Sequence, residues 1–175
     1  AIPAQRAQIR KQPVLTCQAI GNRIEKEAVV VSTWLAYNEL AWTDDLLGDP
    51  TEYERDVALF ADLINRTATV PPVTLLHLGC GAGGHDRFFK RRYAVTGVDI
   101  SVGMLERARD ANPDVEYFHD DMRSVRLDRQ FDAVVIPDSI DYMVTVDDLR
   151  LAIKTAVTHL KTGGILLVVA NVEER

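Results

Sequence analysis

A cluster of glycines is the first feature of this sequence that suggests chemistry. The run Gly79-Cys80-Gly81-Ala82-Gly83-Gly84 follows an apolar segment, 73–78, that is typical of a buried strand. Glycine allows the backbone to approach a ligand closely because no side chain intervenes. A nucleotide-like ligand is therefore expected at this turn. The spacing of Gly79, Gly81 and Gly84 also fits G-x-G-x-x-G, which dinucleotide-binding dehydrogenases share, so the turn alone does not identify the cofactor.

An acidic residue ends the next apolar segment, about 20 residues after the first glycine. In Gly97-Val98-Asp99-Ile100-Ser101 the carboxylate of Asp99 is predicted to accept hydrogen bonds from the hydroxyls of a ribose. The alternative is that Asp99 merely caps the helix after Ser101. Ile100 would offer an apolar face to adenine.

A third polar group, Asp120-Asp121-Met122-Arg123, follows the next short apolar segment. It is placed to meet the edge of an adenine from the other side of the same crevice. The alternative for Asp121 is an acidic residue of a solvated loop.

These residues must be positioned by alternating strands and helices. The sequence predicts strands over 73–78, 93–98, 115–118, 131–136 and 165–170, and helices over 86–92, 101–111 and 146–160. Short connections between such elements suit parallel pairing. We therefore predict an α/β fold, a doubly wound Rossmann-like parallel sheet of five strands flanked by helices.

The first part of the chain has a different pattern. A short helix is predicted over 14–26, an amphipathic helix from Ser32, and a third helix from near Asp49 or Thr51 to about Asn65, with Pro50 in its first turn. Residues 1–70 are thus expected to form a helical N-terminal extension with entry or lid helices. Residues 71–175 would form the core of what is one domain overall.

Composition and residue spacing disfavour several classes of partner and location. The 20 Lys and Arg against 26 Asp and Glu give a net charge of −6, which disfavours a nucleic-acid partner. No apolar run approaches the roughly 20 residues that span a bilayer, and no signal-like segment is visible, so a cytoplasmic location is expected. The four histidines and two cysteines lack zinc-like spacing, and we assign no metal.

Five ordered segments together resemble the class I S-adenosylmethionine-dependent methyltransferases. They are LHLGCGAGG, GVDIS with MLERAR, FHDDMRSVRL, FDAVVIPDSIDYM and LKTGGILLVVA, and they cover about residues 73 to 170. The resemblance implies that S-adenosyl-L-methionine is bound by Tyr37, His77, Gly79, Cys80, Gly81, Ala82, Gly83, Asp99, Ile100, Met104, Asp121, Met122, Ile136, Pro137 and Asp138.

Within that set, the resemblance implies particular roles. The glycines would pass under the methionine part, Asp99 would hold the ribose, and Ile100 would flank adenine. Asp121 would accept from the adenine amino group, and the backbone amide of Met122 would donate to the ring. The segment 136–138 would lie under the sulfonium and line the entry for the methyl acceptor.

One position departs from the family pattern. The family usually has Asp or Glu two residues before the first glycine, where the acid steadies the glycine loop and the methionine end, and this chain has His77. Two readings stay open: His77 hydrogen-bonds in the same place, or it is a satisfied histidine of the strand.

The segment 34–42 is similar to the Tyr-x-x-Leu-Ala entry helix of small-molecule methyltransferases, including sugar amine and glycine-type N-methyltransferases. In those families the helix forms a lid. Tyr37, Trp42 and Tyr53 are therefore candidates to cover the cofactor, because aromatic faces attract a sulfonium cation. The alternative is that they form the apolar stripe by which the helix packs.

The resemblance implies methyl transfer to a nitrogen or oxygen of a small-molecule acceptor. Such transfer depends mainly on alignment and exclusion of water, so a base is optional; the candidates are His85, Asp138, Asp141 and Tyr142. Two alternatives remain: an NAD-dependent oxidoreductase, and a protein that binds S-adenosylmethionine without catalysis.

The fifth strand is expected to have an exposed edge, because family members continue with two further strands. An apolar edge such as 165–170 is usually covered in soluble proteins. We expect a truncated fragment, or coverage of this edge by the first 28 residues or by another chain, as in a homodimer.

Overall fold

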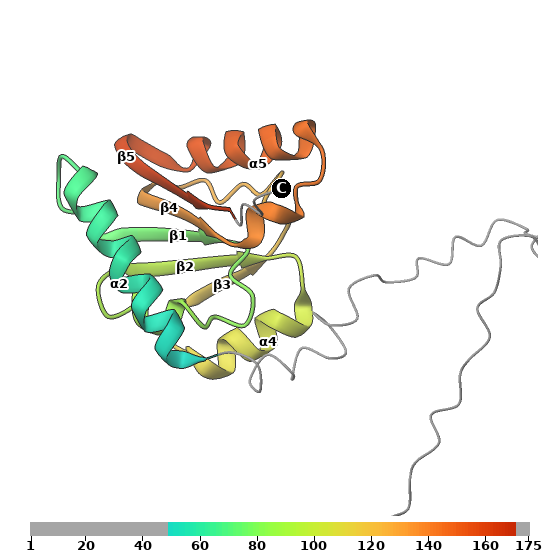
Figure 1. Ribbon diagram of the computed structural model, residues 1–175. Helices are drawn as coiled ribbons and strands as arrows, with labels where there is room; N and C mark the ends of the chain where they lie inside the picture. Colours follow the sequence, from blue (N-terminus) through green and yellow to red (C-terminus); the bar gives the residue numbers. More distant parts are fainter. Residues whose placement is uncertain (1–48, 171–175) are drawn as a thin grey trace, which may run out of the picture. The chain divides into compact units, whose positions relative to one another are not determined.

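The computed structural model describes residues 49–170 of the chain. The predicted helices at 14–26 and from Ser32, together with Tyr37 and Trp42, lie outside the described residues. Five parallel strands form one sheet in the order β3-β2-β1-β4-β5, which Figure 1 shows from β3 at the bottom to β5 at the top. The strands are β1 (Thr74–Leu78), β2 (Ala94–Asp99), β3 (Glu116–His119), β4 (Phe131–Pro137) and β5 (Leu160–Val169).

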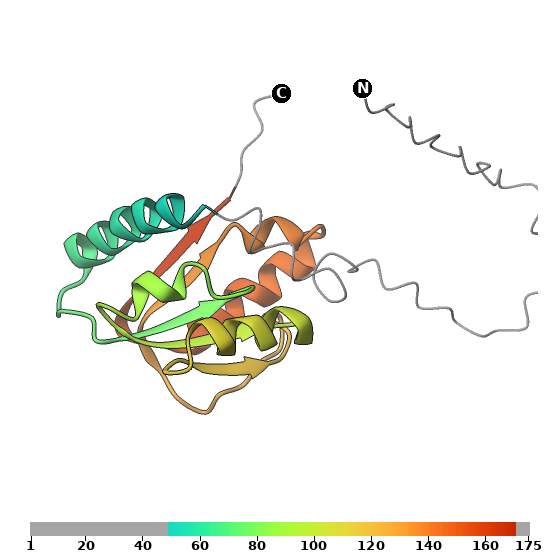
Figure 2. The same cartoon turned by 90° about the horizontal axis from the view of Figure 1, so that it is seen from below.

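Helices cover both faces of this sheet. They are α2 (Pro50–Thr67), α3 (Asp86–Phe89), α4 (Val102–Ala111) and α5 (Val146–Thr158), with a 3-10 helix η3 (Ser139–Tyr142) after β4. Apolar residues of α2, α3 and α4 pack on one face of the strands, and α5 packs on the other (Figure 2). The side chains of β1 show this division, since Leu75 belongs to the first cluster and Leu76 and Leu78 belong to the second. The predicted doubly wound fold is confirmed.

The predicted helix near residue 50 is confirmed as α2. Asp49 caps it by accepting from the backbone nitrogen of Thr51 at 2.8 Å, and Pro50 occupies the first turn, where a missing N–H costs nothing. One side of the helix is apolar, with Val57, Phe60, Ala61 and Ile64 buried. Because these residues join the cluster on the sheet, α2 contributes to the same core as the strands. A domain boundary near residue 70 stays a prediction.

The last strand differs most from the prediction. It begins at Leu160 instead of 165, and α5 ends two residues earlier than expected, at Thr158. Leu160 pairs with Phe131, and the register then shifts, so that Ala133 is opposite Ile165. Gly163 takes a φ of 80° in this irregular stretch, a value that favours glycine. The alternation of strand-like and helix-like segments in the sequence did not by itself indicate a strand interrupted in this way.

A partly buried carboxylate, that of Asp132, links β4 to both of its neighbouring strands. Asp132 accepts from the backbone nitrogen of Thr74 at 2.8 Å, from the Thr74 hydroxyl at 2.7 Å and from Lys161 Nζ at 2.8 Å. Burial opposes the charged form of Asp132, but the hydrogen bonds from Lys161 and Thr74 outweigh it and hold its pKa well below the usual range.

We expect Asp132→Asn to lower the free energy of unfolding by about 1–2 kcal/mol, because an amide replaces a charged acceptor of several donors. The pKa of Asp132 is lower in the folded chain than in the unfolded chain. The carboxylate therefore stabilises the fold at pH values above the unfolded pKa of aspartate, and this stabilisation is lost as the pH falls through the folded pKa. Urea unfolding at pH 7 and at pH 3 measures it. Equal stability of the two proteins at pH 7 would contradict the prediction.

Candidate functional site

The carboxyl ends of the strands define a crevice where β1 and β4 lie side by side and the chain order reverses. Ligands of doubly wound sheets bind at such a switch point. Two chambers open here, and both are lined by Gly79, Gly81, Ser139 and Tyr142. The first chamber is completed by Val98, Asp99, Ile100, Ser101, Asp120, Asp121, Met122, Arg123 and Met143. The second is completed by Tyr53, His77, Cys80, Ala82, Gly84, His85, Met104, Pro137, Asp138 and Asp141.

The glycine turn forms the floor between the chambers. The backbone nitrogens of Gly79 and Cys80 both donate to the carbonyl of Val98, at 2.8 and 3.1 Å, which holds the turn against β2. Gly79 has a φ of 74°, and a Cβ added there would lie 2.2 Å from Ser139 Oγ. Gly81 has a φ of 53°, and nothing lies within 4 Å of its added Cβ. The turn thus leaves open space above Gly81, where a ligand can pass.

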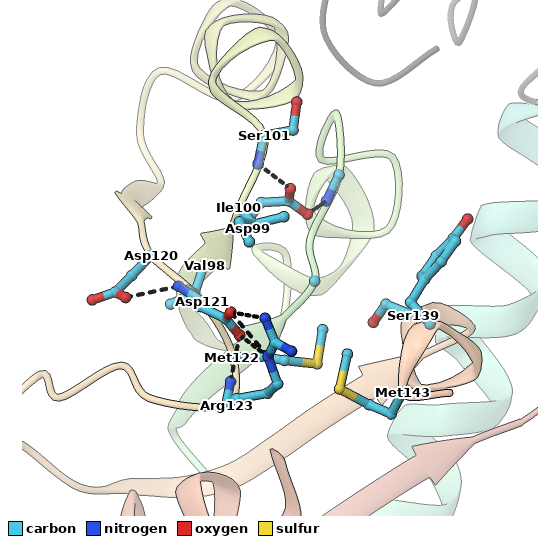
Figure 3. Close-up of a pocket in the computed structure, with 13 residues that line it drawn as sticks. Val98, Asp99, Ile100, Ser101, Asp120, Asp121, Met122, Arg123, Ser139 and Met143 are labelled. Carbon is cyan, nitrogen blue, oxygen red and sulfur yellow. Dashed lines mark hydrogen bonds and ion pairs between the residues drawn. The ribbon is translucent and has the colours of Figure 1, made fainter. Parts of the chain in front are cut away.

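Asp99 ends β2 with its carboxylate at the edge of the first chamber. One oxygen accepts from the backbone nitrogen of Gly81 and the other from that of Ser101, each at 2.8 Å (Figure 3). The helix cap proper is Ser101, which accepts from Met104 N at 3.2 Å. Asp99 therefore steadies the glycine turn and the start of α4 together, and the lone pairs that remain on a carboxylate are available to hydroxyls.

Apolar side chains bound the rest of the first chamber. Ile100 is 55% exposed although it is large and apolar. Met122 and Met143 extend toward one another in Figure 3, and both line this chamber. Polarizable methionines and an exposed Ile suit a flat, apolar ring system.

Asp121 is a partly buried loop residue that is held in an ion pair. Arg123 donates to its carboxylate through Nε, at 3.0 Å to each oxygen, and also through its terminal nitrogen (Figure 3). Hydrogen bonds from this guanidinium lower the pKa of Asp121, and Arg123 also reaches Asp148 of α5 at 2.7 Å. Its neighbour Asp120 is exposed at the same chamber and accepts from the backbone nitrogen of Asp121 at 2.7 Å.

His77 is buried on β1, and Asp86 of α3 lies 2.7 Å from its Nδ1. It is thus a hydrogen-bonded strand histidine, and it also lines the second chamber. His85 packs edge-on against Tyr53, with ring centroids 4.8 Å apart. Burial, and then the charge of His77, lower the pKa of His85 to about 4, so His85 is neutral at pH 7.

The rim of the second chamber is acidic. Asp138 follows β4 with a φ of 56°, a backbone conformation that costs a non-glycine residue about 1–3 kcal/mol and is concentrated at functional sites. Partial burial, reinforced by the charges of Asp56 and Asp141, raises the pKa of Asp138. Tyr142 stands beside them and is 46% exposed.

Within residues 49–170, two predicted cofactor residues line neither chamber. Ile136 is fully buried in the apolar cluster on the α5 side of the sheet. A Cβ added at Gly83 would lie within 2.8 Å of the side chains of Asn112 and Tyr117. Gly83 therefore lacks a side chain because these two residues pack against it below the turn.

Several lining residues were not assigned a role from the sequence, among them Arg123, Ser139 and Met143. Arg123 lay inside a motif that we had noted, and its position two residues after Asp121 was a usable signal. Ser139 and Met143 depend on how η3 folds back after β4, which no local pattern specifies. Among residues 49–170, no group of three or more His, Cys, Asp or Glu is arranged to hold a metal.

Comparison with known proteins defines the class. Residues 75–164 match the family described as "Methyltransferase domain". A dTDP-3-amino-3,4,6-trideoxy-alpha-D-glucopyranose N,N-dimethyltransferase of Streptomyces venezuelae is 36% identical over 70% of this chain and 52% of its own length. The crystal structure of Streptomyces venezuelae DesVI matches with a TM-score of 0.69 and 30% identity, over 76% of this chain and 57% of that one. CalS10 is an amino pentose methyltransferase from Micromonospora echinaspora whose structure was solved with S-adenosylmethionine bound. It matches with a TM-score of 0.67 and 29% identity, over 77% of this chain and 56% of that one.

The fold and crevice are those of a class I methyltransferase. The chain belongs to the methyltransferase domain family, whose model matches more than half of its length. This match favours the methyl-transfer prediction over the NAD-dependent alternative. The chain spans about half the length of the curated relatives that it matches.

Proposed function

We propose that this chain binds S-adenosyl-L-methionine and transfers its methyl group to a nitrogen of a small-molecule acceptor. The observation that carries the proposal is the first chamber, in which one carboxylate, Asp99, supports an open glycine turn beside an exposed apolar face. A nucleoside needs this combination, since its ribose is polar and its base is flat. The bound cofactor supplies a methyl group on a sulfonium, which is already a strong electrophile.

In this proposal the adenosine part occupies the first chamber. Asp99 accepts from the ribose hydroxyls, and Ile100 and Met122 flank the adenine. Arg123 already occupies both oxygens of Asp121, so an adenine amino group shares that carboxylate or uses the exposed Asp120 instead. The methionine part crosses the turn at Gly81 into the second chamber.

The acceptor would then approach from the acidic rim of the second chamber. Asp138 and Asp141 attract a protonated amine, and such an amine must lose a proton before its nitrogen can attack the methyl group. Asp138 is the first candidate to take that proton, because burial and its acidic neighbours raise its pKa. The relatives described above are N,N-dimethyltransferases of amino sugars, which supports nitrogen over oxygen as the acceptor atom.

Calorimetry with S-adenosylhomocysteine and with NAD tests the cofactor. We expect binding of the first alone, and binding of NAD alone would refute the proposal. Transfer of labelled methyl groups to a panel of amino sugars, simple amines and hydroxyl compounds then tests the activity. If the cofactor binds but nothing in the panel is methylated, the non-catalytic alternative is favoured.

Two wider expectations remain proposals. No helix among residues 49–170 has the length and apolar character needed to cross a membrane; a cytoplasmic location is still a prediction. In the described sheet β5 has a neighbour on one side only, β4. A homodimer that covers the free edge predicts a dimeric mass in light scattering.

A further inference from the structure

Two polar side chains are buried on the inner face of α5. Thr155 and His159 are 1% and 2% exposed, although the same face of the helix packs Ala152 and Ala156 into an apolar cluster on the sheet. Burying a hydroxyl or an imidazole is unfavourable unless its polar atoms are hydrogen-bonded. Thr155 and His159 line neither chamber. Their hydrogen-bond partners therefore account for their presence in the core.

The hydroxyl of Thr155 holds the loop that follows β3. A threonine within a helix can donate to the carbonyl four residues earlier, as Thr158 does at 2.8 Å. Thr155 Oγ1 instead donates to the backbone carbonyl of Arg123, at 2.9 Å, and accepts from Arg126 Nη1 at 3.3 Å. The hydroxyl therefore fixes the backbone of Arg123, the residue whose side chain binds Asp121.

His159 holds the other end of the same loop. Its Nε2 accepts from the backbone nitrogen of Leu127 at 3.1 Å, and its Nδ1 is 2.8 Å from the carbonyl oxygen of Thr155. A backbone N–H can only donate and a carbonyl can only accept, so the ring carries its proton on Nδ1. Both ring nitrogens are thus used, one to bind Leu127 and the other to orient the ring on α5.

Asp148 gives α5 a third contact with this loop, near the start of the helix. Its carboxylate accepts from Arg123 Nη1 at 2.7 Å. Asp148, Thr155 and His159 are spaced seven and four residues apart, which places them on one face of an α-helix. The loop 121–127 is therefore attached to one face of α5 through Arg123 and Leu127.

A short turn carries this attachment to the first chamber. The backbone nitrogens of Ser124 and Val125 both donate to the carbonyl of Asp121, at 2.9 Å, and Asp121 Oδ1 accepts from the backbone nitrogen of Arg123 at 2.8 Å. Val125 is fully buried in the cluster on the α5 side of the sheet. Asp121 and Met122 therefore keep their places relative to the backbone of Arg123, and α5 determines where they lie at the first chamber.

We infer that Thr155 and His159 are positioning residues for recognition of the base, because they hold Asp121 and Met122 in place at the first chamber. This inference rests on the proposed function, since it requires the adenine to be bound beside the loop 121–127. Thr155 and His159 do not touch the ligand in this arrangement. Their effect on binding passes through the loop.

Two ligands separate recognition of the base from the rest of binding. They are S-adenosylhomocysteine and its analogue in which hydrogen replaces the amino group of the adenine. In calorimetry we expect the wild type to prefer the first about tenfold, the usual effect of one hydrogen bond to a charged group. Thr155→Val keeps nearly the same shape but removes the hydroxyl. It should reduce this preference to less than about threefold, mainly by weakening binding of S-adenosylhomocysteine.

Two further substitutions of threonine are the controls. Thr155→Ser keeps the hydroxyl, so it should keep the preference of the wild type. Thr158→Val removes a hydroxyl that is bonded only four residues back within α5, and it should leave both affinities within about twofold of wild type.

His159 offers a second and independent pair of variants. In His159→Asn the amide occupies the place of Nδ1 and falls short of Leu127. In His159→Gln it reaches the place of Nε2 and can accept from that backbone nitrogen. We expect the preference for S-adenosylhomocysteine to be reduced in the asparagine variant and retained in the glutamine variant. Thermal unfolding verifies that each variant is folded.

Three results would overturn the inference alone. An unchanged preference in folded Thr155→Val and His159→Asn would show that the loop keeps its place without these residues. Equal losses for both ligands would give Thr155 and His159 a merely structural role, and equal binding of both ligands by the wild type would mean that the loop does not read the amino group. If the wild type binds neither ligand, the proposed function fails and this inference fails with it.

Discussion

Asp99→Ala is expected to weaken binding of S-adenosylhomocysteine by at least about 100-fold. The substitution removes the charged acceptor for two ribose hydroxyls, and each such hydrogen bond is worth about 1.5–3 kcal/mol. It also removes the acceptor of the backbone nitrogens of Gly81 and Ser101, both at 2.8 Å, so the turn loses its support. Calorimetry with the unreactive product measures the loss directly.

Asp110→Ala is the matched control for this prediction. Asp110 is an exposed acid of α4 that lines neither chamber, and its loss changes the net charge equally. We expect its affinity for the ligand to stay within about twofold of wild type. A change of less than about threefold in Asp99→Ala would mean that Asp99 serves the fold alone.

The second large effect is expected for Gly79→Ala, which should abolish detectable binding and lower the free energy of unfolding by about 2–5 kcal/mol. The new Cβ would lie 2.2 Å from Ser139 Oγ and 2.9 Å from Met122 Cε, so η3 or the turn must shift. Its φ of 74° adds about 1–2 kcal/mol of strain for any residue with a side chain. Denaturant unfolding and calorimetry measure the two effects separately.

Substitutions at two other glycines distinguish the cost of a positive φ from the cost of a steric clash. Gly163 has a φ of 80°, and the nearest atom to an added Cβ is 3.7 Å away, so Gly163→Ala should cost only the strain and leave binding intact. Gly81→Ala meets nothing within 4 Å, but its methyl group enters the space proposed for the ligand. We expect normal stability apart from the strain, with binding at least about tenfold weaker. Wild-type affinity in Gly79→Ala would refute the assignment of the turn.

The elements of the core were predictable because each is encoded locally. Apolar runs of strand length, separated by helix-length segments, indicated parallel strands with crossover helices, and α2 was indicated by Asp49 and Pro50 at its start. The early start of β5 was not predictable, because Leu160 pairs with Phe131 through a long-range register shift. Local pattern assigned Leu160 to the preceding helix, and only its partner strand decides otherwise.

The site was predictable in part for the same reason. Asp99 and the glycines follow strands directly. Parallel pairing therefore brings them to the carboxyl edge of the sheet, independently of the loop conformations. Arg123 pairs with Asp121 because a turn places them together, and Ser139 contacts Gly79 because η3 folds across β1. Those contacts depend on loop conformation, which has no periodic signal.

The sequence by itself determined that this chain is a doubly wound α/β domain with a glycine turn suited to a nucleotide, because the alternation of strands and helices and the glycine spacing are local patterns. Only the tertiary structure decided what His77 does. In the sequence it is an unexplained departure from a family pattern, nine residues from Asp86. Folding α3 onto β1 places the two side chains 2.7 Å apart and out of water, where each satisfies the hydrogen-bonding group of the other.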